Sequence, residues 1–259
     1  MNMSSFFKVV LVTGARQVGK TTMLEHLSKK DGRIHVSLDD LMVRDMAKSD
    51  PALFFQNYPP PVLVDEIQYA PELFQQIKIL CDASEETGQF WLTGSQQYSM
   101  MKNVQQTLAG RMGILELHSL SRNEIEGTVN AESIDFSLAG LQKRQLLAQK
   151  NDLLKTFDYI WRGGMPQVQR ADDEQREVYY ESYVNSYIMR DVTQLGGVTD
   201  ALRFRKFINA CAALTAKLVN YKILSEFAEV SHNRQQKNGF VCWRGWGLSI
   251  FSNPTTTMP

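Results

Sequence analysis

The segment from residue 11 to residue 24 constrains this chain most strongly, because it contains the complete motif G-x-x-x-x-G-K-T. A loop between Gly14 and Gly19 can bend until its backbone N–H groups converge on phosphate oxygens. Lys20 then reaches the β- and γ-phosphates, and the Thr21 hydroxyl can ligate Mg²⁺. The motif predicts a nucleoside triphosphate site whose loop residues are Gly14, Ala15, Arg16, Gln17, Val18, Gly19, Lys20, Thr21 and Thr22.

The residues on either side supply the strand–loop–helix context that the motif requires. The run "FFKVVLV" before the loop is typical of a buried parallel strand. After the loop, Met23, Leu24 and Leu27 follow helical spacing. A helix that begins here directs its positive end at the phosphates. The alternative is a glycine-rich turn without a ligand, and the flanking pattern argues against it.

Composition excludes several classes of protein. The 259 residues, 43% of them hydrophobic, are enough for one large domain or two. A net charge of +0 gives no whole-chain basic field for nucleic acid. Cys81, Cys211 and Cys242 are odd in number and unevenly spaced, which argues against a disulfide framework or zinc site. Because no run approaches the roughly 20 apolar residues of a membrane span, we expect a cytoplasmic protein.

A pair of acidic residues follows a predicted buried strand. Residues 33–40 are typical of a second strand, and the third ends at Asp65 and Glu66 before a helix that starts at Pro71. Asp65 can bind Mg²⁺ through its water shell, and Glu66 can orient or deprotonate the water that attacks the γ-phosphate. Such a pair alone is commonly a solvated strand end. Downstream of a complete phosphate loop, it predicts the hydrolytic half of the site.

The fourth predicted strand, residues 89–97, ends in the polar residues Thr93, Ser95 and Gln96. Ligands of open parallel sheets bind beyond the carboxyl ends of the strands, so these side chains should face the same crevice. We take Ser95 as the candidate γ-phosphate sensor. The alternative is that Ser95 only caps a helix beginning near Tyr98.

Arg111 lies between a helix that ends at Gly110 and a fifth predicted strand, residues 111–117. In a homo-oligomer it could reach the phosphates of a neighbouring subunit as an arginine finger, a device that supplies roughly 10³ to 10⁵ in rate. The alternative is a surface ion pair.

Several motifs occur in order along the chain: "GARQVGKTT", "VLVDEIQ", "LTGSQQ", "LAGRMGILEL", "YIWRGGMPQ" and "YYESYVNSYIMRDV". Together they resemble the bacterial and archaeal AAA-type ATPases that carry a C-terminal winged-helix extension of unassigned function. The resemblance runs from about Phe6 to Ser231. It implies an α/β fold with a P-loop core of parallel sheet and flanking helices, ATP with Mg²⁺, and a role coupled to DNA or to a partner protein.

The resemblance also implies a helical lid. The Gly164, Met165, Pro166 element matches a lid motif that lies near the nucleotide base, which assigns Pro166 to nucleotide binding. The residues alone indicate only a helix stop followed by a turn. Arg162 and Arg190 are lid arginines that either sense the γ-phosphate or have structural roles.

These features predict four regions. Residues 1–126 form the ATPase core, 127–195 the helical lid, 196–231 the start of a winged-helix domain, and 232–259 a poorly ordered tail. Within the lid, Tyr180, Tyr183 and Tyr187 share a helix face, which favours core packing over nucleic-acid stacking. The basic segment that follows predicts two helices, but the base-reading helix expected after them is not visible.

The tail from about His232 lacks helical or strand periodicity. Regrouping its codons by one frame permits a message with a proline near a helix start, an amphipathic helix stopped by glycine, and an apolar strand. We therefore predict a frameshift after about Ser231 that removes the recognition helix and with it DNA binding. The alternative is a genuine divergent tail.

The leading functional hypothesis is an ATP hydrolase whose nucleotide state moves the lid and a C-terminal DNA- or protein-binding module. One alternative is a nucleotide-operated binding switch with negligible turnover. A kinase-like phosphotransferase is disfavoured, because Glu66 beside Asp65 suits water activation and no acceptor site is evident.

Overall fold

The computed structural model describes residues 3–29, 31–95, 107–128, 135–147, 152–188 and 201–214. Two compact units are present: the first consists of residues 1–117 and 183–259, and the second of residues 118–182. The domain boundaries predicted after residues 126 and 195 do not coincide with these units and stay predictions.

In the described part of the first unit, one parallel sheet has the strand order β2-β3-β4-β1-β5. The strands are β1 (Val9–Gly14), β2 (Ile34–Ser37), β3 (Val62–Asp65), β4 (Phe90–Ser95) and β5 (Met112–Glu116). Each overlaps a segment that the sequence predicts as a strand, with β1 continuing two residues beyond the predicted end at Val12, and the α/β class is confirmed. The order places β4 between β1 and β3, which strand prediction alone does not determine.

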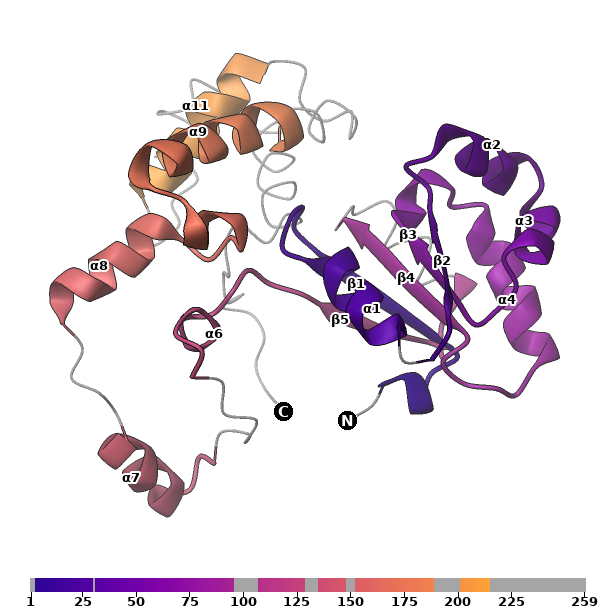
Figure 1. Cartoon of the computed structure of the whole chain (residues 1–259), viewed down its shortest axis with the longest axis horizontal. Helices are drawn as coiled ribbons and strands as arrows, with labels where there is room; N and C mark the ends of the chain where they lie inside the picture. Colours follow the sequence, from indigo (N-terminus) through magenta and orange to yellow (C-terminus); the bar gives the residue numbers. More distant parts are fainter. Residues whose placement is uncertain are drawn as a thin grey trace, which may run out of the picture. The chain divides into compact units, whose positions relative to one another are not determined.

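Alternate residues of a strand point to opposite sides of the sheet, so both faces of this sheet carry apolar side chains. Helices cover both faces. On one face, α2 (Leu41–Ser49), α3 (Pro51–Asn57) and α4 (Leu73–Ala83) enclose the larger core, which includes Leu11, Phe54, Phe74, Ile77 and Leu92. On the other face, α1 (Lys20–Ser28) contributes Leu24 to a smaller cluster with Val10, Val12, Leu63 and Trp91. Figure 1 shows α2, α3 and α4 grouped together and α1 apart from them.

The helices α2 and α3 were not predicted, although both have recognisable start signals. The Asp40 carboxylate accepts hydrogen bonds from two backbone N–H groups at the start of α2. The Asp50 carboxylate accepts one such bond, from the Leu53 N–H of α3, and Pro51 occupies the first turn of that helix. Acidic N-caps and an N-terminal proline are standard helix starts. The two helices were missed because each is short and its apolar residues are interrupted by polar ones.

The second unit contains α6 (Arg122–Ile125), α7 (Leu138–Leu147), α8 (Leu153–Arg162), the 3-10 turn η3 (Gln167–Arg170) and most of α9 (Asp173–Tyr183). The predicted stop of α8 is confirmed, because the helix ends at Gly163 with φ 74°. The Tyr180 hydroxyl donates a hydrogen bond to the Arg162 carbonyl at 2.9 Å. This half-buried tyrosine therefore joins α9 to the end of α8.

Beyond α9, the described residues form the π-helical turn η4 (Val184–Ile188) and α11 (Ala201–Ala213). The predictions for Arg190, for the second helix of the basic segment and for the tail at 232–259 lie outside the described residues, as does most of the predicted start of a winged-helix domain. No helix within the described ranges combines the length and apolar character needed to cross a membrane.

Candidate functional site

The phosphate loop connects β1 to α1, and its two motif glycines have different reasons to be glycine. Gly14 has φ 146°, and a Cβ added there would lie 2.1 Å from the Leu117 carbonyl oxygen. Gly19 precedes α1 in the left-handed conformation, with φ 97° and open space around it. Gly14 is therefore required by a close backbone approach and Gly19 by its dihedral angles.

Lys20 is buried at the first position of α1. Its Nζ donates hydrogen bonds to the carbonyl oxygens of Gly14 at 3.1 Å and Ala15 at 2.8 Å. Burial lowers the pKa of Lys20, while the charges of Glu66 and Asp65 act in the opposite direction. The lysine ammonium thus lies inside the loop and within the field of both acidic residues.

Asp65 links three segments of the site through its carboxylate. The Thr21 hydroxyl of α1 donates to Asp65 Oδ1 at 2.9 Å, and the Thr93 hydroxyl of β4 donates to the same oxygen. Thr93 is fully buried and its hydroxyl also accepts the backbone N–H of Glu66 at 3.0 Å. The register of β3 and β4 explains this contact, because Val64 pairs with Leu92 immediately before it. Thr93 therefore connects the two acidic residues.

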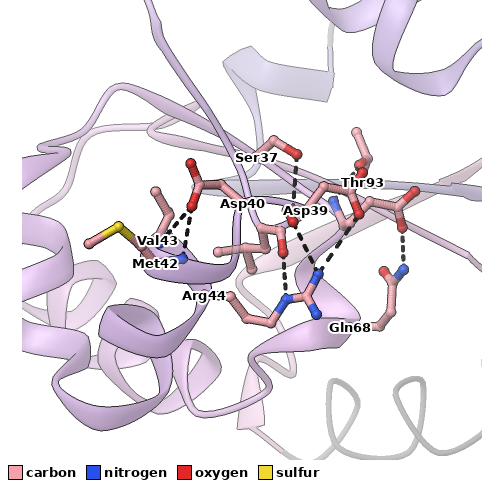
Figure 2. A network of polar contacts seen from close by, with 10 residues as sticks. Ser37, Asp39, Asp40, Met42, Val43, Arg44, Gln68 and Thr93 are labelled. Carbon is pink, nitrogen blue, oxygen red and sulfur yellow. Dashed lines mark hydrogen bonds and ion pairs between the residues drawn. The ribbon is translucent and has the colours of Figure 1, made fainter.

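Glu66 is one of two described non-glycine residues with a positive φ, at φ 58° and ψ 46°. A 3-10 turn, η2 (Ile67–Tyr69), follows it, and the Tyr69 N–H donates to the Glu66 carbonyl at 3.0 Å. Gln68 Nε2 donates a hydrogen bond to Glu66 Oε2. Figure 2 shows Gln68 and Thr93 in one network of polar side chains. Sequence reasoning missed Gln68, for which its position in "DEIQ" was the available signal.

Arg44 of α2 lies beside this turn and was also missed. Its Nε donates to the Leu38 carbonyl at 2.7 Å, and its guanidinium lies 4.1 Å from the centre of the Tyr69 ring. Asp39 forms a long ion pair with it, at 3.9 Å (Figure 2). Arg44 thereby joins the segment after β2 to the turn that follows Glu66. No spacing in the sequence indicates this contact.

The remaining predicted residues lie elsewhere. Ser95 is the last residue of β4 and pairs in register with Gly14, which places its backbone beside the phosphate loop. Pro166 precedes η3 in the second unit. The roles of both stay predictions.

Arg111 and the phosphate loop lie at opposite ends of β1. The Arg111 carbonyl accepts the N–H of Val9, the first residue of β1, whereas the loop follows its last residue. Its Nε donates to Asp82 Oδ1 at 2.6 Å. This ion pair is the alternative that the sequence left open for Arg111. A finger acting in trans stays a prediction.

The oxygen donors beside the phosphate loop suit Mg²⁺. Within the described ranges, no group of three or more His, Cys, Asp or Glu side chains could form an all-protein metal site. Mg²⁺ in phosphate-binding sites needs no such group, because it takes one or two protein oxygens and completes its shell with phosphates and water. The hydroxyl of Thr21 and the carboxylate of Asp65, already in contact, fit that requirement.

Two parts of the chain match protein-family models. Residues 6–126 match the model of an AAA domain. That stretch contains the phosphate loop, the Asp65 and Glu66 pair, Thr93 and Arg111. Residues 154–237 match a domain of unknown function, DUF8612. This part of the chain is therefore similar to AAA domains, in agreement with that part of the predicted resemblance.

Two relatives align with about three quarters of the chain. The uncharacterized proteins Mb2031c of Mycobacterium bovis and Rv2008c of Mycobacterium tuberculosis are each 25% identical to the chain over 200 residues. The alignment covers 76% of this chain and 39% of each relative, so the chain spans about two fifths of their length.

A solved structure has a related fold. The Walker-type ATPase PABY2304 of Pyrococcus abyssi superimposes with a TM-score of 0.53 over 93% of this chain and 85% of its own. The sequence identity is 13%, so the similarity concerns the fold alone.

Proposed function

We propose that the chain binds ATP with Mg²⁺ at the phosphate loop and hydrolyses it. The observation that carries this proposal is the contact of Thr21 with the Asp65 carboxylate, beside a buried Lys20 and next to Glu66. These residues come from the start of α1 and the end of β3, and they supply a phosphate-binding cation, Mg²⁺ donors and a base for water in one place.

Each residue has a distinct task in this mechanism. The loop N–H groups and Lys20 bind the phosphates, and the lysine exchanges its bonds to the Gly14 and Ala15 carbonyls for phosphate oxygens. The Thr21 hydroxyl and Asp65 would hold Mg²⁺, which neutralises charge on the β- and γ-phosphates when bound. The Glu66 carboxylate orients the attacking water and accepts its proton.

Phosphate release under steady-state conditions tests the proposal. We expect Mg²⁺-dependent release by the wild type and loss of about 10² or more in rate for Glu66→Gln. Glu72→Gln is the matched control, because it makes the same change at an exposed glutamate six residues along the chain. Equal loss in both variants, or none in Glu66→Gln, contradicts the assigned role of Glu66.

Binding is tested separately with a fluorescent ATP analogue. Lys20→Ala should weaken affinity by at least about tenfold, because it removes the buried cation of the loop. Lys48→Ala, at an exposed lysine of α2, should bind as the wild type does. The binding-switch alternative predicts tight ATP binding without turnover in the wild type, so the two assays together separate a switch from a hydrolase.

The trans role of Arg111 is a further part of the proposal. Mixing inactive Arg111→Ala with inactive Glu66→Gln should restore some hydrolysis in shared oligomers, because one interface then contains an intact arginine and an intact Glu66. Absence of recovery in proven mixed oligomers argues against a finger.

We also propose that nucleotide state is coupled through a lid that includes Pro166 to a C-terminal DNA- or protein-binding module, with the recognition helix lost by a frameshift after about Ser231. Resequencing the locus tests the frameshift. A clean read with no winged-helix coding in either alternative frame refutes it.

A further inference from the structure

The side-chain amide of Gln68 has a bonded nitrogen and a buried oxygen without a hydrogen-bond partner among the described residues. Its Nε2 donates to Glu66 Oε2, and its Oε1 is shielded from solvent. The orientation of the amide follows from chemistry, because an ionised carboxylate accepts hydrogen bonds and cannot donate to Oε1. A buried acceptor without a donor costs free energy, so this oxygen has an unmet capacity for a proton donor.

The turn holds this amide and the Glu66 carboxylate in a fixed relation. The Glu66 N–H is bonded to Thr93, and the Glu66 carbonyl accepts the N–H of Tyr69. Ile67, between the two side chains, is fully buried. Arg44 packs against the ring of Tyr69, the last residue of η2. Both side chains therefore project from one anchored segment of four residues.

The Gln68 amide takes no part in the backbone hydrogen bonds of its own turn. Here, the backbone bonds of the turn are made by Tyr69 and Ala70, and the Gln68 amide is bonded to the carboxylate that the proposed mechanism uses. The geometry points to Gln68 as a positioning residue for hydrolysis. It fixes the rotamer of Glu66, the residue that orients the attacking water. This inference rests on the proposed ATP hydrolysis.

The proton balance of the step is complete. One hydrogen of the water faces the Glu66 carboxylate, whose rotamer is fixed by the Gln68 amide. As the water oxygen bonds to the γ-phosphorus, Glu66 takes the first proton. The bond between the γ-phosphorus and the bridging oxygen breaks, and its electron pair passes to the β-phosphate of ADP. Gln68 remains unchanged and supplies orientation alone.

Two substitutions test the inference. Gln68→Met keeps the length of the side chain and removes both polar ends, and Gln68→Asn keeps the amide and withdraws it from the carboxylate. We expect each to lower kcat by about 10 to 100-fold, a part of what general-base catalysis contributes. The dissociation constant of the fluorescent ATP analogue should stay within about twofold, because Gln68 makes no bond to the phosphate loop. Gln75→Met, at an exposed position of α4, is the control.

A double-mutant cycle separates positioning from a structural role. In the Glu66→Gln background, single-turnover hydrolysis of radiolabelled ATP should fall little further when Gln68→Met is added, because the carboxylate to be positioned is gone. A structural role predicts the same fold-loss in both backgrounds, and that result overturns the inference. An unchanged or raised kcat in both Gln68 variants also overturns it, while a Glu66-dependent wild-type activity leaves the proposed function intact. A wild type without Glu66-dependent hydrolysis overturns both.

Discussion

Thr93→Val is the substitution that most directly tests how the site is held together. Valine keeps the shape of threonine in a fully buried position of β4 and removes only the hydroxyl. That hydroxyl donates to Asp65 Oδ1 and accepts the N–H of Glu66. The change therefore removes both contacts that connect β4 to the acidic pair, without leaving a cavity.

The magnitude follows from those two bonds. A neutral hydrogen bond contributes about 0.5–1.5 kcal/mol, and one to a charged group about 1.5–3 kcal/mol. We therefore expect Thr93→Val to lower the free energy of unfolding of the first unit by about 2–4 kcal/mol. Thr13→Val is the matched control, because Thr13 is a buried strand threonine whose hydroxyl makes one 3.3 Å bond to the Leu115 carbonyl. Its expected cost is about 1 kcal/mol.

Amide hydrogen exchange of β3 and β4 peptides, measured as urea is increased, reports this stability without interference from the second unit. The same variant should also lower kcat more than it weakens ATP binding, since Glu66 loses its backbone anchor. A Thr93→Val protein that exchanges and hydrolyses ATP as the wild type does would refute the reasoning.

Three further results are expected. Gly14→Ala should destabilise the first unit by about 2–6 kcal/mol, because strain at a positive φ and overlap with the Leu117 carbonyl add together, and a melting curve measures this. Lys20→Met should raise the free energy of unfolding at pH 7, because burial lowers the pKa of Lys20 and the charged lysine destabilises the folded state. In denaturant unfolding, this difference between variant and wild type should shrink as pH rises from the lowered pKa towards 10.5, where the unfolded lysine also loses its proton. Burial raises the pKa of Cys211 from 9.0 to about 11, so its alkylation at pH 8, followed by mass spectrometry, should be about 100-fold slower than that of an exposed thiol.

The strands and the phosphate loop could be predicted because their signals are local. A glycine motif and runs of β-branched residues fix what Val9 to Gly14 can form without reference to the rest of the chain. The same holds for the stop of α8 at Gly163. The helices α2 and α3 were missed even though Asp40 and Asp50 cap them, because their apolar residues are few and their length is short.

The internal order of the site could not be predicted, because it depends on which strands become neighbours. The sequence predicts that Thr93 and Ser95 both face the crevice, but it does not indicate which side chain contacts the acidic pair. Only the position of β4 beside β3 brings the Thr93 hydroxyl to Asp65. The contact of Gln68 with Glu66 depends on the left-handed conformation of Glu66, and the position of Arg44 depends on its stacking against Tyr69. No periodic pattern in the sequence encodes either feature.

The close approach of Gly14 to Leu117 sets a lower limit on any excised nucleotide-binding fragment. The Leu117 N–H donates to the Thr13 carbonyl at 2.7 Å, and its own carbonyl lies over Gly14. A fragment that stopped at the last residue of β5, Glu116, would keep the five described strands but lose both contacts of Leu117 with the start of the phosphate loop. The phosphate loop of that fragment would then be free to adopt other conformations, even with the hydrophobic core fully packed. Expression boundaries for crystallisation or ligand screening should therefore be placed after Leu117.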